Sequence, residues 1–254
     1  MTMKKIILLL SLLSFSFGFS QNKVLFNEAT ELYNNGEYSA AIENYEQIIE
    51  NGEHSASLYF NLGNCYYKLN SIGPSIYYYE KALLLSPNNK EIQNNLRFSQ
   101  NMRLDAIEEM PKTELSRIYN VIVGMFSSDQ WAYFAVGFVF LFVLAYMAYY
   151  FLRSANQKRA TFISSILSLV LGVVCILMAY LNYQRYKKDD PAIIFSKEVK
   201  VNSEPNNNSS TIFTIHEGTK VNVLDKLDDW KRIRIADGQT GWLKDGNVRK
   251  IKDF

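Results

Sequence analysis

Histidine and cysteine are the side chains most often used as metal ligands, general bases and nucleophiles, and this chain has two of each. They lie far apart in the sequence, at His54, Cys65, Cys175 and His216, and none forms part of a CxxC motif or a Cys/His cluster with metal-ligand spacing. The sequence also contains no GxSxG, HExxH, P-loop or GxGxxG motif. We therefore predict no catalytic residue, no metal and no cofactor, and expect a protein that is not an enzyme.

Charge divides the chain into three parts. Residues 21–110 hold 6 Lys/Arg and 12 Asp/Glu, residues 111–188 hold 8 and 2, and residues 189–254 hold 11 of each. The basic excess lies beside the most apolar part of the chain, where anionic lipid headgroups attract cations. This placement favours a membrane as a partner and argues against nucleic acid.

Two uncharged apolar runs occupy residues 131–152 and 162–183. Each has about 22 residues, enough for a helix to cross a hydrocarbon core roughly 30 Å thick. Because only residues 153–161 separate them, we expect a two-helix transmembrane hairpin whose outer ends emerge on the same side. Ser164, Ser168 and Gly172 form a row of small residues on the second helix, which would let either the first helix or another membrane protein approach closely.

Residues 1–20 have the pattern of a signal peptide: a basic start, an apolar stretch and small residues before a cleavage site at Gln21. An uncleaved signal anchor is the alternative. Export would place residues 21–130 outside the cytoplasm, and the hairpin would return the C-terminal region to that side. Residues 153–161 would then form a cytoplasmic loop, consistent with its three cations.

A helical pattern repeats between Gln21 and Pro87 with a period of about 34 residues. Ala29 and Gly63 are small at corresponding positions, where the two helices of one unit would cross, while Gly36 and Pro87 mark helix ends. The pattern resembles the tetratricopeptide repeat, with units at about 22–55 and 56–89. A capping helix at about 90–107 would complete a helical domain spanning 21–110.

Tetratricopeptide repeats bind peptides in a concave groove lined by the first helix of each unit. The positions that would face this groove imply a set of peptide-binding residues: Phe26, Thr30, Tyr33, Asn34, Phe60, Asn64, Tyr67 and Lys68. Among them, Asn64 would bond the backbone of an extended peptide and Lys68 would meet a carboxylate. The alternative is a groove covered by neighbouring chain or by a membrane-proximal helix.

Residues 113–128 are predicted to form an amphipathic helix. Its apolar residues fall on one stripe, at Ile118, Val121, Ile122, Met125 and Phe126. Because the stripe comes directly before the first apolar run, we interpret this helix as lying in the membrane interface. A helix packed against the repeat domain is the alternative.

Short alternating runs follow within residues 191–254 and predict five strands, at 199–201, 212–215, 220–224, 230–235 and 241–243. The segments 217–221 and 237–242 resemble the bacterial SH3 domain, a small all-β barrel whose relatives often bind cell-wall peptides or other peptides. The resemblance implies a ligand site at Trp230 and Trp242. Core positions for these two tryptophans are the alternative.

The predicted fold class is thus a multidomain membrane protein with an α-helical tetratricopeptide repeat domain, a transmembrane helical hairpin and a small all-β SH3-like barrel. This order, together with the segments 95–98 and 216–221, is similar to the BatE family of the Bacteroides aerotolerance operon. The resemblance implies partnership with von Willebrand factor A domain proteins and a MoxR-type ATPase, in envelope integrity or oxidative-stress tolerance.

We therefore expect a non-enzymatic inner-membrane scaffold that binds partner proteins through periplasmic repeats and the SH3-like domain. The alternative is a cell-wall tether or sensor. In that case the SH3-like domain would bind peptidoglycan peptides and the repeats would act only as a spacer.

Overall fold

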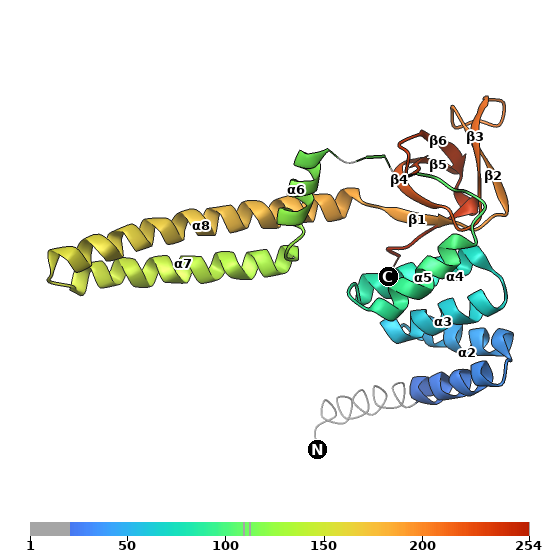
Figure 1. Ribbon diagram of the computed structural model, residues 1–254, viewed down its shortest axis with the longest axis horizontal. Coiled ribbons are helices and arrows are strands. Elements are labelled where there is room, and N and C mark those ends of the chain that lie inside the picture. Colours follow the sequence, from blue (N-terminus) through green and yellow to red (C-terminus); the bar gives the residue numbers. More distant parts are fainter. Residues whose placement is uncertain (1–20, 109, 112, 254) are drawn as a thin grey trace, which may run out of the picture. The chain divides into compact units, whose positions relative to one another are not determined.

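The computed structural model describes residues 21–108, 110–111 and 113–253 (Figure 1). The predicted signal peptide, residues 1–20, lies outside the described residues. The chain divides into two compact units: Met110–Asp189 forms one, and the segments on either side of it together form the other.

The first unit begins with a stack of antiparallel helices. Residues 21–34 are helical and are followed by α2 (Tyr38–Glu50), α3 (Ala56–Lys68), α4 (Ile72–Leu85) and α5 (Lys90–Asn101). Gly36 ends the first helix with a φ of +86°, a conformation that a side chain would resist. Gly63 lies so close to Tyr79 that a Cβ at this position would come within 2.6 Å of its ring.

The capping helix is shorter than the sequence predicts. It was predicted at 90–107, but α5 ends at Asn101. The residues that follow leave the helical path because they contact the C-terminal barrel instead: Asp105 accepts hydrogen bonds from His216 and Thr219, and Ile107 packs against the barrel core.

The C-terminal barrel is built from seven antiparallel strands in the order β3-β2-β6-β5-β4-β1-β7. The strands are β1 (Pro191–Ile194), β2 (Glu198–Asn202), β3 (Thr211–His216), β4 (Lys220–Leu227), β5 (Trp230–Arg234), β6 (Thr240–Lys244) and β7 (Val248–Lys250). The five-strand prediction missed β1 and β7. Strand β1 is buried at all four positions and so shows no alternation, while β7 has three residues.

The barrel and the helices share their apolar cores. Ile193 and Ile251 of the barrel region are buried in the helical core, and the ring of Phe195 meets Tyr77 of α4 edge-on at 5.3 Å. The repeat helices and the barrel are therefore a single packed unit, which we call the repeat–barrel unit.

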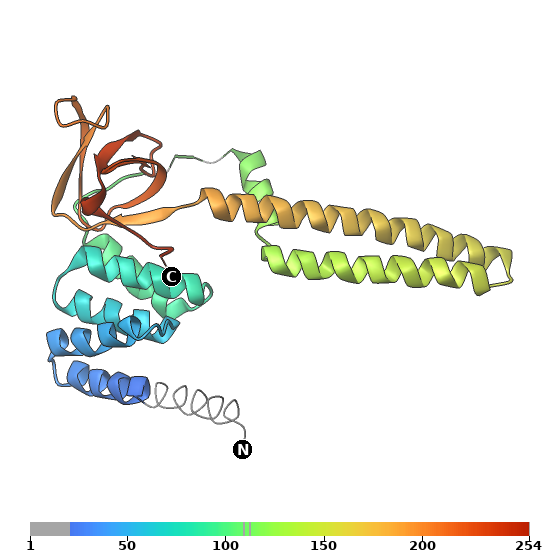
Figure 2. The same ribbon diagram turned by 180° about the vertical axis from the view of Figure 1, so that it is seen from behind.

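The second unit contains α6 (Glu114–Val123), α7 (Ser128–Phe151) and α8 (Ala155–Lys188), with α7 and α8 antiparallel (Figure 2). By length and composition, α7 and α8 are long and apolar enough to cross a membrane. The loop predicted at 153–161 is shorter, because the helix of α8 already begins at Ala155. At its other end α8 continues five residues beyond the predicted limit, to Lys188.

Small residues of α8 form the contact with α7. The buried row consists of Ser165, Ser168, Gly172 and Cys175, and Ser168 Oγ donates a hydrogen bond of 2.7 Å to the carbonyl of Phe138. Ser164, which the sequence places in this row, is exposed. The buried positions are separated by three, four and three residues, which is the spacing that keeps one face of a helix of 3.6 residues per turn towards its partner.

Candidate binding sites

A pocket of about 220 Å³ opens on the helical stack and is lined by Tyr33, Asn64, Tyr67, Lys68, Tyr79, Asn95 and Phe98. We call it the repeat groove. Its walls come from the helix at 21–34 and from α3, α4 and α5. The structure thus brings together four predicted residues and adds three that the sequence reasoning missed.

Hydrogen bonds at the floor of the repeat groove fix the amide of Asn64. Its Oδ1 accepts from the Tyr79 hydroxyl at 2.5 Å and from Asn95 Nδ2 at 3.0 Å. Burial raises the pKa of Tyr79 well above its usual range, so this hydroxyl stays protonated and remains a donor. Both bonds use the amide oxygen, and no acceptor among the described residues is bonded to Asn64 Nδ2, so its N–H groups are available to a ligand carbonyl.

The rim of the repeat groove is aromatic, with a single cation among its lining residues. The rings of Tyr67 and Phe98 are exposed, and 55% of the surface of Phe98 is accessible to solvent. Lys68, beside them, is exposed as well. This arrangement suits an extended peptide segment that offers a backbone carbonyl to Asn64, an apolar side chain to the rings and a carboxylate to Lys68.

The other residues predicted for the groove take part in helix packing or lie outside the pocket. Thr30 Oγ1 donates to the carbonyl of Phe26 at 2.8 Å and contacts the Tyr45 hydroxyl at 3.0 Å. Phe60 is half-buried, with its ring 5.9 Å from that of Tyr79. Asn34 is exposed at the end of the first helix.

The three residues that the sequence analysis did not predict lie outside the first helix of each repeat unit, where groove residues were expected. Tyr79 is on α4, the second helix of its unit, and Asn95 and Phe98 are on the capping helix α5. Their i, i+3 spacing on α5 puts Asn95 and Phe98 on one face. That spacing is the sequence signal that would have found them.

A second pocket, of about 500 Å³, lies on the barrel. It is lined by Glu198, Val199, Lys200, Asn202, Asn207, Ser209, Thr211, Trp230, Lys244 and Asn247. We call it the barrel pocket. Trp230 is in its wall, with Lys244 Nζ 5.9 Å from the ring centroid. Trp242 does not line it; this residue is half-buried on β6, opposite Arg232 of β5.

Charged residues hold the helices and the barrel together at a seam. Asp105 accepts hydrogen bonds from the backbone N–H of His216 at 2.7 Å, from its Nδ1 at 2.7 Å and from Thr219 Oγ1 at 2.6 Å. Burial alone would raise the pKa of Asp105, but the hydrogen bonds from Thr219 and His216 outweigh it and hold this pKa below its usual range. Glu80 of α4 pairs with Lys220 of β4 at 2.8 Å.

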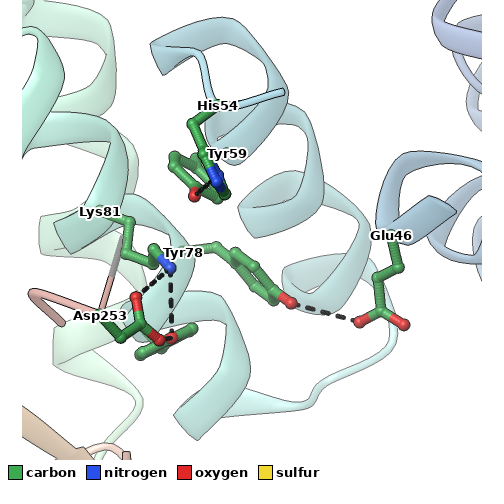
Figure 3. A network of polar contacts seen from close by, with 7 residues as sticks. Glu46, His54, Tyr59, Tyr78, Lys81 and Asp253 are labelled. Carbon is green, nitrogen blue, oxygen red and sulfur yellow. Dashed lines mark hydrogen bonds and ion pairs between the residues drawn. The ribbon is translucent and has the colours of Figure 1, made fainter. Parts of the chain in front are cut away.

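The end of the chain makes the second part of the seam (Figure 3). Asp253 accepts from the Tyr77 hydroxyl at 2.6 Å and pairs with Lys81 at 2.5 Å. Lys81 is only 4% exposed, and its ammonium lies 4.8 Å from the ring centre of Tyr59. A buried cation held by a carboxylate and an aromatic face anchors the C-terminal segment on α4.

Comparisons with known families agree with this architecture. Residues 197–249 are similar to the bacterial SH3 domain and residues 56–89 to the tetratricopeptide repeat. No match was found among curated proteins. The predicted fold class is confirmed: a helical repeat region, two long apolar helices and an SH3-like antiparallel sheet follow each other along the chain. Both matched domain types typically bind proteins or peptidoglycan and do not catalyse reactions.

Proposed function

We propose that this protein is a non-enzymatic inner-membrane scaffold whose repeat groove binds an extended segment of a partner protein. The observation that carries the proposal is the groove itself. Internal hydrogen bonds fix Asn64 at its floor, while Lys68 has no ion-pair partner among the described residues. A preorganised donor beside an unpaired cation and exposed rings is suited to ligand binding, because little has to be rearranged when the ligand arrives.

The seam supports a two-pass topology. Asp105 with His216, and Lys81 with Asp253, each join a residue before the hairpin to one after it. A packed unit built from both flanks requires that both lie on the same side of a membrane. The predicted signal peptide would make that side the periplasm, leaving the short connection between α7 and α8 in the cytoplasm.

Because the seam packs the repeat helices against the barrel, the repeat groove and the barrel pocket would cooperate differently from two sites joined by a flexible linker. Two domains on a flexible linker enhance each other through effective concentration alone. Here the repeat groove and the barrel pocket belong to one packed unit. A partner that reaches both would therefore meet them at a fixed spacing, which favours a protein of defined shape.

The partners that we infer are those of the BatE family: membrane-anchored von Willebrand factor A domain proteins and a MoxR-type ATPase system, acting in aerotolerance or envelope stress. The order of repeat, hairpin and SH3-like domain supports this assignment.

The test is to recover partners from cells with tagged full-length protein in a mild detergent and identify them by mass spectrometry. The most informative variant is Lys68→Glu, because Lys68 is exposed and its side chain makes no hydrogen bond or ion pair with another described residue. Lys90→Glu, at an exposed lysine outside the groove, is the matched control for the change of charge. We expect partner recovery to fall at least tenfold in Lys68→Glu and to stay unchanged in Lys90→Glu. Equal recovery from all three proteins would reject the groove as the binding site.

A cell-wall tether is the second candidate, and the barrel pocket favours it. Trp230 and the lysines of this pocket suit a polar ligand with carboxylates, such as a peptidoglycan stem peptide. Full-length protein in lipid nanodiscs should then bind purified wall fragments, and Trp230→Ala should abolish the binding while Lys68→Glu leaves it intact. Failure of the wild-type protein to bind the fragments would eliminate this function.

A further inference from the structure

Helix α6 is fixed against the end of the hairpin. The carbonyl of Val123 accepts hydrogen bonds from Trp131 Nε1 at 3.3 Å and from Asn182 Nδ2 at 2.7 Å, and Val123 itself is 1% exposed. Arg185 Nη1 donates to the carbonyl of Asn120 at 3.4 Å. Figure 1 shows α6 running steeply across the long axes of α7 and α8. It therefore packs on the hairpin, and the alternative of a helix belonging to the repeat domain does not hold.

The contacts of α6 define its depth along the hairpin. Asn182 lies near the end of the charge-free run of α8, which stops at Gln184. Arg185, one turn further, begins a cationic end that includes Lys187 and Lys188. If the hairpin crosses a membrane, this is the level at which hydrocarbon gives way to headgroups. A helix lying across α8 at this level would run in the plane of the interface.

An apolar arc that no other element covers runs along α6. Its members are all more than a third exposed: Leu115 (82%), Ile118 (55%), Tyr119 (43%), Val121 (61%), Ile122 (45%) and Met125 (61%). At 100° per residue the five that belong to α6 fall on one side of the helix together with Glu114 of its first turn, while Ser116, Asn120 and Arg117 fall on the other. Met125 follows two residues after the end of α6. In water such an arc is unfavourable. The long helices α7 and α8 of the same unit also expose apolar residues along their length, the surface that lipid would cover.

We propose that α6 and the last turn of α8 form a phospholipid-binding site at the membrane interface. The apolar arc of α6 lies among the upper acyl chains. Lys187 and Lys188, with Arg117 of α6, contact the lipid phosphates. Glu114, which pairs with Arg117 at 3.1 Å, and Asp129 at the start of α7 are the acidic groups that α6 and α7 contribute at this end.

Depth measurements on the full-length protein in nanodiscs of phosphatidylethanolamine and phosphatidylglycerol test the proposal. A polarity-sensitive fluorophore is attached to Met125→Cys on the apolar arc or to Ser116→Cys on the opposite side. Cys65 and Cys175 are buried, and protein without an introduced cysteine corrects for labelling there. We expect nitroxide-labelled acyl chains to quench the Met125→Cys probe several-fold more than the Ser116→Cys probe, because Ser116 is half-buried on the side of α6 that contacts the hairpin.

Equal quenching of the two probes would overturn the proposal. So would a Met125→Cys probe that stays open to iodide in nanodiscs and becomes protected only when a co-purifying protein is added, because the arc would then be a protein-docking surface.

A second measurement addresses the headgroups. Electron paramagnetic resonance of spin-labelled phosphatidylglycerol reports the fraction of lipid immobilised by the protein. Lys187→Gln with Lys188→Gln should lower this fraction about twofold, with Arg185 kept to preserve the contact with Asn120. An unchanged fraction would overturn the role of these lysines.

Discussion

Two faces of helix α4 are used in opposite ways. Tyr77 and Lys81 face the seam, where Asp253 of the barrel region satisfies both of them. Tyr79 faces the repeat groove and donates to Asn64, next to a lysine that has no ion pair among the described residues. On the seam face the polar groups are bonded to a carboxylate of the chain itself. On the groove face the tyrosine is bonded to Asn64, but the neighbouring lysine is available for a ligand. The comparison separates residues that stabilise the protein from residues available for a ligand.

The largest loss of stability is expected at the seam. Asp105→Ala removes the acceptor of three hydrogen bonds and leaves the Thr219 hydroxyl, in a residue only 1% exposed, without it. An unsatisfied buried polar group costs about 1–3 kcal/mol. The free energy of unfolding of the repeat–barrel unit should fall by about 3 kcal/mol. Thermal and urea unfolding of the full-length protein in micelles measures it, with Asp225→Ala at an exposed strand position as control. A loss no greater than that of the control would show that Asp105 does not hold the seam.

Two glycines provide a second test of the seam, with a smaller expected loss of stability than Asp105→Ala. Gly218 and Gly36 have φ values of +80° and +86°, so alanine costs about 1 kcal/mol of backbone strain at either position. Only at Gly218 is the space occupied: a Cβ there would lie 3.0 Å from Ile76 and 3.2 Å from Ile72, whereas Gly36 has nothing within 4 Å. We expect Gly218→Ala to lose about 2–3 kcal/mol and Gly36→Ala about 1 kcal/mol in urea unfolding. Equal losses of unfolding free energy in the two variants would show that Gly218 is not tightly packed against α4.

Acid should weaken the seam. The pKa of Asp105 is lower in the folded protein than its usual value of about 3.9, so the unfolded chain binds the proton more readily. Stability from Asp105 is therefore complete above about pH 4 and declines as the pH falls through the lowered pKa. Urea unfolding at a series of pH values should show the difference between wild type and Asp105→Asn narrowing towards acid. A constant difference would contradict the charged role of Asp105.

In the repeat groove, Asn64 and Lys68 should behave differently. Asn64→Ala removes the acceptor for Tyr79 and Asn95 and should cost about 1 kcal/mol as well as reduce partner recovery. Lys68→Glu should change stability by less than about 0.5 kcal/mol while abolishing recovery. Unfolding and co-purification are measured on the same preparations. A Lys68→Glu protein that is strongly destabilised would assign this lysine to the fold and not to a ligand.

The sequence predicts the parts of the molecule that have a period. The repeats, the two apolar helices and the alternating strands β2 to β6 could be found because their apolar residues recur with a helical or a strand spacing. The seam could not be predicted, since Asp105 lies in an irregular segment and its partners are more than a hundred residues away. The groove was predicted at Tyr33, Asn64, Tyr67 and Lys68. The spacing of Asn95 and Phe98 shows only that they share one face of α5, and how that face packs against α3 and α4 depends on contacts between helices that are far apart in the sequence.

Photocrosslinking in living cells tests the central claim most directly. Phe98 lines the repeat groove and is 55% exposed, so a photoreactive benzoylphenylalanine in its place should fit without disturbing the core. Val24, 52% exposed and outside the groove lining, is the control position. If the repeat groove binds a ligand, a partner is crosslinked from position 98, and this crosslink is lost in Lys68→Glu and absent from position 24. The same crosslink from both positions, or one that persists in Lys68→Glu, would contradict a ligand-binding groove.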